Sequence, residues 1–246
     1  MGAERAIPTP EAATTGSVEV ALFDLDVPGT KLAKYYSYLH ADERARAARF
    51  RHDRDRNHFI ARRGQLRIRL AQEFGEAPEE IRIRMDAHGK PFLPEHPELC
   101  FNLTHSHGLA LCAIGHGVMV GCDIEWRNPE LACRDVADRL FAPSERAALA
   151  ALPNALWVDG FFNCWTRKEA YVKALGMGLS FSLDAFSVSV APGEPPRLIE
   201  ASPGWSLSSF EPAPGYQAAL VVETGSRSDP RCRETARMRE PQGLPW

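Results

Sequence analysis

Apolar and polar residues alternate along several short segments of the chain, while other segments place apolar residues three or four positions apart. The first pattern predicts strands and the second predicts helices, because side chains share a face every second residue in strands and about every 3.6 residues in helices. We therefore expect strands at residues 18–25, 81–85, 100–103, 109–115, 118–126, 186–190, 205–210 and 217–222. Helices are expected at residues 31–50, 53–74, 131–140, 143–152 and 156–175. Their mixed order predicts an α+β fold.

Composition narrows the class of protein. The 246 residues include 29 Lys and Arg against 32 Asp and Glu, with 44% hydrophobic and 25% charged residues, which is typical of a soluble globular protein. No apolar run approaches the roughly 20 residues of a membrane helix, and the N-terminus does not resemble a signal peptide. The six cysteines form no Cys-x-x-Cys pair, which favours a reducing compartment. We expect a cytoplasmic protein with no membrane partner.

The charge is unevenly distributed. Ten arginines lie between Arg44 and Arg69 and only Asp53 and Asp55 oppose them, which leaves a formal charge of +8 over 26 residues. Guanidinium groups pair well with phosphate oxygens, so this block is a candidate anion site. A solvated helix face and a nucleic-acid-binding module are the alternatives. The block lacks interleaved aromatic residues, which counts against nucleic acid.

A pair of acidic residues follows Gly121 in the sequence Gly-Cys-Asp-Ile-Glu. In a strand, Asp123 and Glu125 project from one face, about 7 Å apart at their Cα atoms, while Ile124 points to the other. Two carboxylates at this spacing repel each other unless a cation or donor lies between them. Hard oxygen ligands suit Mg²⁺, although solvated acids at an exposed strand end would give the same pattern.

A second candidate group lies on the helix expected at residues 156–175. Trp165, Glu169 and Lys173 are spaced four residues apart and so share one stripe of that helix. Glu169 could serve as a third metal ligand or as a general base, and Lys173 could neutralise phosphate charge. A routine Glu–Lys pair on an amphipathic helix is the plainer interpretation.

A third group combines a lysine, a hydroxyl and an imidazole. Gly89 and Pro91 bracket a turn that presents Lys90, and a strand end presents Thr104 and His105. All three side chains can contact phosphate. Together with the acidic residues they indicate a Mg²⁺-dependent site for a phosphate or pyrophosphate.

The chain resembles the Sfp-type 4′-phosphopantetheinyl transferases of the holo-[acyl-carrier-protein] synthase superfamily. The resemblance spans roughly residues 40–190 and rests on five segments in the family's order: GKPFL (89–93), FNLTHS (101–106), VGCDIEWRNP (120–129), FAPSE (141–145) and FFNCWTRKEAYVKALGMGL (161–179). Thr104 stands where the family commonly has serine, which keeps the hydroxyl.

The resemblance implies a reaction and its participants. Enzymes of this family transfer the phosphopantetheine arm of coenzyme A to a serine of an apo acyl, peptidyl or aryl carrier protein and release adenosine 3′,5′-bisphosphate. It implies Mg²⁺, or Mn²⁺ in its place, held by Asp123, Glu125 and Glu169, with Glu169 also as the base. Asp123, Glu169 and Lys173 are the implied catalytic residues. The implied contacts of coenzyme A are Arg46, Arg54, Arg62, Lys90, Thr104, His105, Asp123 and Lys173.

The resemblance also implies two similar α+β halves in one chain, with the site between them. We expect a flexible leader at residues 1–16, an N-terminal half at 17–119 with the coenzyme A-binding residues, and a C-terminal half at 120–224 with the carboxylates. A disordered tail is expected at 225–246, and a monomer suffices for a complete site. The alternative functions are another Mg²⁺-dependent phosphotransferase or pyrophosphatase, a nucleic-acid-binding module and an inactive carrier-protein binder. All expected catalytic positions are filled, which counts against the last.

Overall fold

The computed structural model describes residues 16–177 and 181–224. The predicted leader and tail lie outside the described residues, apart from Gly16. In the described ranges no helix combines the length and the hydropathy that crossing a bilayer requires.

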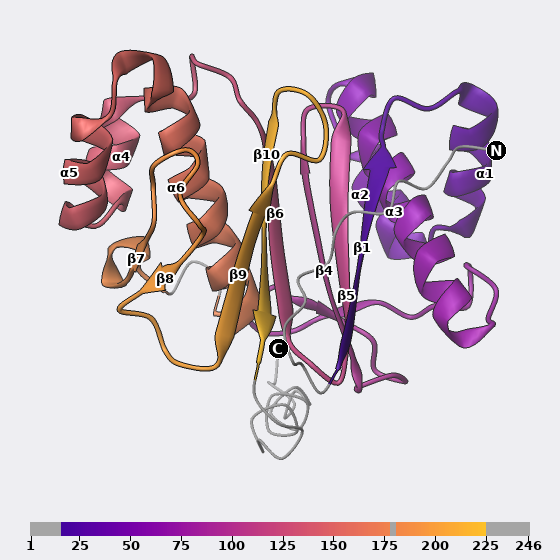
Figure 1. Cartoon of the computed structure of the whole chain (residues 1–246). Coiled ribbons are helices and arrows are strands. Elements are labelled where there is room, and N and C mark those ends of the chain that lie inside the picture. The colour runs from indigo at the N-terminus through magenta and orange to yellow at the C-terminus, as the bar shows by residue number, and fades with distance from the viewer. Residues whose placement is uncertain (1–15, 178–180, 225–246) are drawn as a thin grey trace, which may run out of the picture.

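Two three-stranded antiparallel sheets form the centre of the molecule (Figure 1). The first has the order β1 (Ser17–Asp24), β5 (Leu109–His116), β4 (Leu99–Ser106), and the second has the order β6 (Val120–Trp126), β10 (Tyr216–Glu223), β9 (Trp205–Phe210). Three residues, 117–119, connect strand β5 to β6, and Gly117, with φ of +69°, is one of them. Strands β4 and β6, one from each sheet, are in contact.

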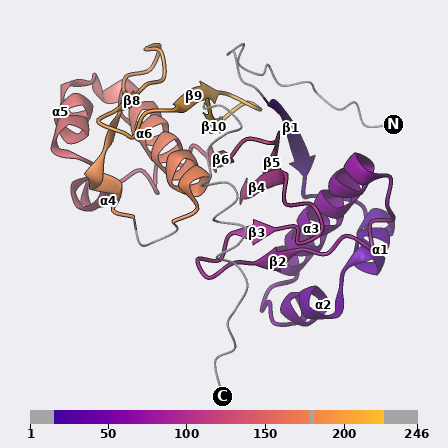
Figure 2. The ribbon, with the colours of Figure 1, turned by 90° about the horizontal axis from the view of Figure 1, so that it is seen from below.

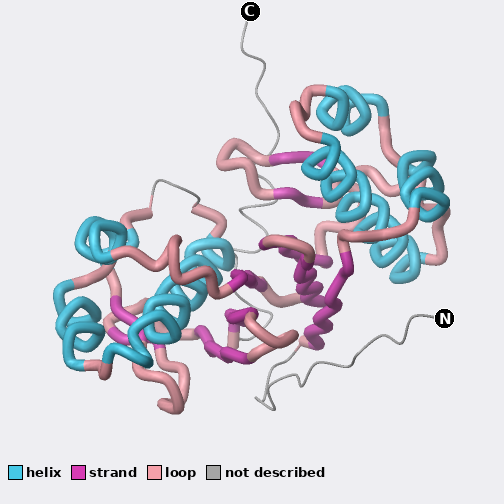
Figure 3. The backbone as a smooth tube through the Cα atoms, turned by 90° about the horizontal axis from the view of Figure 1, so that it is seen from above, coloured by secondary structure: helices cyan, strands magenta, loops and turns pink. Residues whose placement is uncertain are grey.

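Helices lie on the outer side of each sheet, which Figure 3 shows from above with the strands between them. The first sheet has on its outer side α1 (Gly29–Tyr38), α2 (Ala41–Ala48) and α3 (Asp53–Phe74). The second sheet has on its outer side α4 (Arg134–Leu140), α5 (Pro143–Ala151) and α6 (Asn154–Leu175). The short pairs β2 (Arg84–Met85) with β3 (Pro91–Phe92) and β7 (Ser187–Val188) with β8 (Leu198–Ile199) lie outside the two sheets (Figure 2), and a 3₁₀ turn spans Leu183–Ala185.

Four apolar clusters of the described residues hold this arrangement together, and the smallest packs α1 and α2 on α3 around Phe59. Of the other three, one packs α3 on the first sheet and includes Leu66 and Phe101, and another packs α6 on the second and includes Phe162 and Val221. The third lies between the sheets and draws from both, with members such as Leu111. The α+β prediction is confirmed, and the arrangement is a pair of similar halves. The predicted boundary between residues 119 and 120 coincides with the start of β6 but stays a prediction.

The helix expected at residues 31–50 is wrong as a single element. It breaks at Leu39, which is extended with φ of −72° and ψ of 140°. The backbone N–H of His40 donates to Oε2 of Glu43 at 3.0 Å, so a capping box starts α2 here. Apolar periodicity continues across the break, which is why the pattern did not reveal it.

Strand β4 is longer than the expected strand at 100–103, because it runs on through the polar residues to Ser106. Its odd-numbered members Phe101 and Leu103 pack in the cluster under α3. Its even-numbered members Asn102, Thr104 and Ser106 hydrogen-bond to residues of β6. The strand therefore presents its alternate residues to two different surroundings.

Candidate active site

The two acidic residues of β6 are each bonded to a hydroxyl of β4. Thr104 Oγ1 donates to Oδ1 of Asp123 at 3.1 Å, and Ser106 Oγ donates to Oε2 of Glu125 at 2.7 Å. Residues 104 and 106 share a face of β4, and residues 123 and 125 share a face of β6, as strand alternation requires. The two carboxylates thus lie on one side of β6, as predicted from the sequence, at the contact between the halves.

Asp123 is the most deeply placed of these carboxyl groups, with 2% of its surface exposed. Its Oδ1 accepts from Lys173 Nζ at 2.5 Å, whereas its buried Oδ2 has no hydrogen-bond partner among the described residues. Burial raises the pKa of Asp123, and Lys173 and Thr104 partly oppose that rise. An unpartnered buried carboxylate oxygen is costly, so this atom fits a ligand that carries positive charge.

Glu125 and Glu169 form an acidic group with Asp123: they lie near enough for its carboxylate to raise the pKa of both, although the three residues are not among the described side chains whose ligand atoms all lie within 4.8 Å of one another. Burial and then the nearby Asp123 carboxylate raise the pKa of Glu125 to about 7, against hydrogen bonds from Ser106 and Trp165. Burial also raises the pKa of Glu169, with Asp123 adding to the rise and Lys173 opposing it. Three carboxyl groups that resist ionisation together are what a divalent cation would relieve, and carboxylate oxygens are the ligands that Mg²⁺ prefers. The chemistry of these residues, three carboxyl groups and one unpartnered buried oxygen, therefore fits this ion, which would draw their oxygens together on binding.

Lys173 joins the acidic group from helix α6. Burial lowers its pKa, but the ion pair with Asp123 outweighs that effect and the pKa is raised. Lys173 Nζ also lies 3.3 Å from Thr104 Oγ1. The lysine is therefore charged at neutral pH and bound to a carboxylate.

Gly121 explains how α6 comes so near to β6. A Cβ atom at this position would lie 2.2 Å from both the Ala170 carbonyl oxygen and the Ala174 nitrogen. Only a residue without a side chain permits this approach, which brings the Glu169 and Lys173 turns of α6 to Asp123. No role was predicted for Gly121 from the sequence, although glycine within a strand pattern often signals close backbone contact.

The predicted arginines line a cavity of about 420 Å³ beside the acidic group. Arg46, Arg54 and Arg62 all line it, together with His58 and His105. Arg62 Nη1 donates to Nδ1 of His105 at 2.5 Å. Desolvation and then Arg62 lower the pKa of His105 to about 4, and desolvation with neighbouring arginines lowers that of Arg62 to about 10. Three arginines face one lining carboxylate, Asp55, and such an excess of positive charge is typical of an anion site.

Other arginines of the basic block have structural partners. Arg63 and Arg67 both donate to the buried carboxylate of Glu43, at 2.5 Å and 2.8 Å. Glu43 lies one residue before the block, and no feature of the sequence predicts that it pairs with two arginines of the next helix. Only a part of the +8 charge is therefore available to a ligand.

Two predicted phosphate contacts lie elsewhere than in the arginine cavity. Lys90 Nζ donates to the Ala174 carbonyl at 3.0 Å, so it reaches from the turn between β2 and β3 to the C-terminal end of α6. The Thr104 hydroxyl bonds to Asp123, on the opposite face of β4 from His105. Their contacts with coenzyme A stay predictions.

Lys168 and Glu145 are buried residues that hold the second half together. Lys168 Nζ lies 2.8 Å from Glu145 Oε1 and donates to two carbonyl oxygens at 2.6 Å. Glu145 also accepts from the backbone N–H groups of Ala142 and Val188. The lysine next to Glu169 therefore has a structural role, and Glu145 supports α6 through it.

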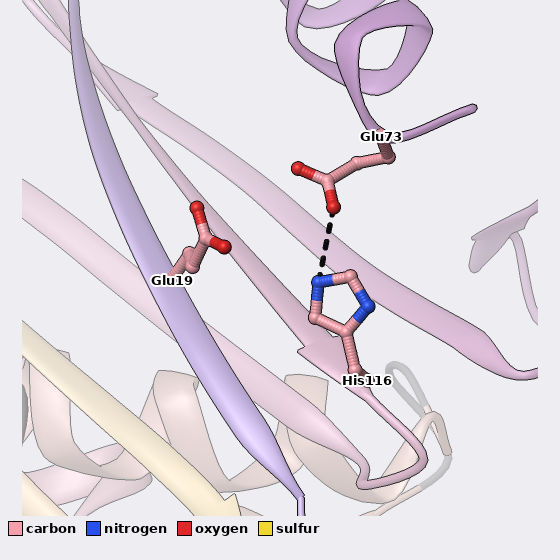
Figure 4. Close-up of side chains that lie close together, drawn as sticks. All are labelled: Glu19, Glu73 and His116. Carbon is pink, nitrogen blue, oxygen red and sulfur yellow. Dashed lines mark ion pairs between the residues drawn. The ribbon is translucent and has the colours of Figure 1, made fainter. Parts of the chain in front are cut away.

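A separate cluster of titratable side chains connects α3 with strands β1 and β5 of the first half (Figure 4). Glu73 of α3 accepts from Nε2 of His116 at 3.1 Å, and Glu19 of β1 lies beside both. Arg69 forms ion pairs with both Glu19 and Glu73. The guanidinium already balances the two carboxylates, so we interpret this cluster as an ionic contact between α3 and its sheet.

Comparison with known proteins gives the family. A profile described as the 4′-phosphopantetheinyl transferase superfamily matches residues 119–221, and one described as 4′-phosphopantetheinyl transferase, N-terminal, matches residues 29–115. The chain is 37% identical over 221 residues to the 4′-phosphopantetheinyl transferase HetI of Nostoc sp., covering 88% of this chain and 92% of that one.

Two further similarities concern Bacillus proteins. The 4′-phosphopantetheinyl transferase Sfp of Bacillus subtilis is 28% identical over 191 residues, covering 77% of this chain and 84% of that one. A holo-(acyl-carrier-protein) synthase from Bacillus anthracis, solved in complex with coenzyme A, aligns with a TM-score of 0.36 and 27% identity over 44% of this chain and 96% of that one. With both halves matched by family profiles and a relative aligned over most of its length, the chain belongs to the 4′-phosphopantetheinyl transferase superfamily.

Proposed function

We propose that this enzyme moves the 4′-phosphopantetheine group from coenzyme A to a serine of an apo carrier protein at the contact between β4, β6 and α6. Family membership gives the transferase class. The observation that carries the assignment of the site is the buried, unpartnered Oδ2 of Asp123 among three carboxyl groups, next to an arginine-lined cavity.

Asp123, Glu125 and Glu169 would hold a Mg²⁺ ion, or Mn²⁺ in its place. When bound, the ion neutralises charge on the pyrophosphate of coenzyme A. Phosphoryl transfer depends mainly on alignment and on such neutralisation, and requires little covalent chemistry from the protein.

The nucleotide end of coenzyme A would lie in the arginine cavity. Arg46, Arg54 and Arg62 offer guanidinium donors there, and His105 can accept a proton when a phosphate approaches. The burial of Arg62 Nε without a partner among the described residues supports an anion at this position. Lys173, and Lys90 after leaving Ala174, would neutralise the remaining phosphate charge.

The reaction joins the serine oxygen of the carrier to the phosphorus that bears pantetheine. The bond from that phosphorus to the bridging oxygen breaks, and adenosine 3′,5′-bisphosphate leaves with that oxygen. Glu169 takes the serine proton, and its raised pKa suits a general base. We further propose that the enzyme acts as a monomer in the cytoplasm and does not act on nucleic acid.

A transfer assay with matched variants tests the assignment. The protein is incubated with apo carrier, coenzyme A and Mg²⁺, and the carrier is weighed by mass spectrometry. Wild-type protein should add one phosphopantetheine group, and Asp123→Asn or Glu169→Gln should slow transfer by at least about 10²-fold, the usual loss when one stabilising group is removed. Asp159→Asn, which changes a half-exposed carboxylate on the same helix, is the control.

The outcomes separate the alternatives. Hydrolysis of coenzyme A without modification of any carrier type would support a pyrophosphatase instead. Wild-type rates in both carboxylate variants would remove Asp123 and Glu169 from the site, whereas loss of activity in Asp159→Asn alone would place the chemistry elsewhere.

A further inference from the structure

We propose that Ser106 is a positioning residue for Glu125, whose carboxylate it orients toward the cation. The inference rests on the cation site of the proposed function and concerns a residue with no direct part in the reaction. Ser106 belongs to β4 of the first half, whereas Glu125 belongs to β6 of the second.

The hydrogen bonds of the Ser106 hydroxyl fix its direction. The backbone N–H of Trp126 donates to Ser106 Oγ at 3.0 Å, and Ser106 Oγ donates to Oε2 of Glu125 at 2.7 Å. A serine hydroxyl has one proton to give, so with Trp126 as donor to its oxygen that proton is directed at the carboxylate. The backbone of β6 thereby sets the orientation of a hydroxyl that in turn holds a side chain of β6.

Glu125 needs such a partner more than Asp123 does. Asp123 is short, buried and already bonded to Thr104 and Lys173. Glu125 is longer and partly exposed, so it loses more conformational freedom when it binds an ion. Trp165 is a second donor to this carboxylate. Holding Oε2 in advance through Ser106 lowers the cost of binding an ion, as residues behind a metal ligand commonly do.

Ser106 also lies at the border of the two parts of the site. It lines the arginine cavity together with His105, while its hydroxyl reaches the acidic group. The plainer interpretation is that the hydroxyl only satisfies the Trp126 N–H. That role would affect stability but would leave cation affinity unchanged.

Mn²⁺ binding to the full chain without coenzyme A separates the two roles. Free Mn²⁺ is followed by electron paramagnetic resonance during titration of the wild type, Ser106→Ala, Ser106→Thr and Ser37→Ala. Ser106→Ala should bind Mn²⁺ about tenfold more weakly, and Ser106→Thr, which keeps the hydroxyl, should bind like the wild type. Ser37→Ala removes an exposed hydroxyl hydrogen bond on α1 and should have no effect.

Equal Mn²⁺ affinity of the wild type and Ser106→Ala would overturn the proposal, as would a wild type that binds no Mn²⁺. Transfer assays provide a separate readout, because the rate of Ser106→Ala should recover when Mn²⁺ is raised about tenfold. A rate that stays low at saturating Mn²⁺ also contradicts the positioning role. A wild type whose Mn²⁺ affinity depends on Ser106 but which modifies no carrier would refute the proposed function and leave this inference standing.

Discussion

His105 and Thr104 are sequence neighbours with different surroundings. Strand alternation predicted that Asp123 and Glu125 share a face, and the structure agrees. The same alternation turns Thr104 toward Asp123 and His105 toward Arg62. Which face of β4 meets which partner depends on the packing of the two halves, and that packing leaves no local signal in the sequence.

The pKa of His105 gives a prediction at this scale. Histidine NMR signals should show His105 titrating near pH 4 in the free protein, below the usual 6.5, because desolvation and Arg62 oppose its charge. Adenosine 3′,5′-bisphosphate should raise that midpoint, since phosphate favours the imidazolium. The His105→Gln variant assigns the signal, and a free-protein midpoint near 6.5 would contradict the assigned environment.

The lowered pKa of His105 also makes the free energy of unfolding depend on pH. Between about pH 6.5 and pH 4 the unfolded chain takes up a proton at His105 that the folded protein does not. His105 therefore lowers the free energy of unfolding as the pH falls through that range. A bound phosphate that raises the pKa should reduce this loss.

Helix α6 was predicted from the sequence more accurately than the other elements. Its close packing against β6 was not predicted. Its limits, its αL residue Gly176 and the stripe of Trp165, Glu169 and Lys173 follow from periodicity and from helix-end chemistry. Its distance from β6 depends on Gly121, whose role appears only once the two elements are packed.

We expect Gly121→Ala to lower the free energy of unfolding by about 3 kcal/mol, because the added methyl group collides with backbone atoms of α6. Transfer should also slow, since Glu169 and Lys173 move away from Asp123 with the helix. Urea unfolding and the transfer assay measure both effects. Gly29→Ala, where a Cβ meets nothing within 4 Å, is the control, and unchanged stability of Gly121→Ala would refute the close contact.

The buried ion pairs between helices could not be predicted from the sequence either. Glu43 looks like one acid on a charged helix, yet it binds Arg63 and Arg67 of α3. The arginine block was predicted as a unit, and tertiary packing divides it into structural arginines and cavity arginines.

At the scale of the whole molecule, the two halves share an apolar cluster and a group of polar side chains in which Thr104 and Ser106 of one half bond to the carboxylates of the other. The α+β class and the order of the elements were predicted from the apolar pattern, and the pair of similar halves from the resemblance. The position of the active site between the halves stays a prediction. The apolar core between the sheets was not predicted. Strands that are buried on both faces show no alternation of apolar and polar residues, so the sequence does not indicate which element packs on each face.

This shared core predicts one cooperative unfolding transition. Tryptophan fluorescence, which in the described residues reports on the second half, and far-UV circular dichroism should give the same urea midpoint. Leu111→Ala, in β5 of the first half, should lower both midpoints together and cost about 2–5 kcal/mol. Leu131→Ala, which is 62% exposed, is the control, and two separate transitions would show that the halves unfold independently.

The alternation of β4 has a consequence for altering the enzyme. His105, at an odd-numbered position, lines the cavity proposed for the nucleotide, whereas Thr104 and Ser106, at even-numbered positions, hold the acidic group. On the proposed function, a substitution at His105 would alter the nucleotide cavity alone, whereas a substitution at Ser106 would reach both the cavity and the acidic group. We therefore expect preference for the donor molecule and capacity for phosphoryl transfer to separate at the adjacent codons of Thr104 and His105, and to stay coupled at Ser106.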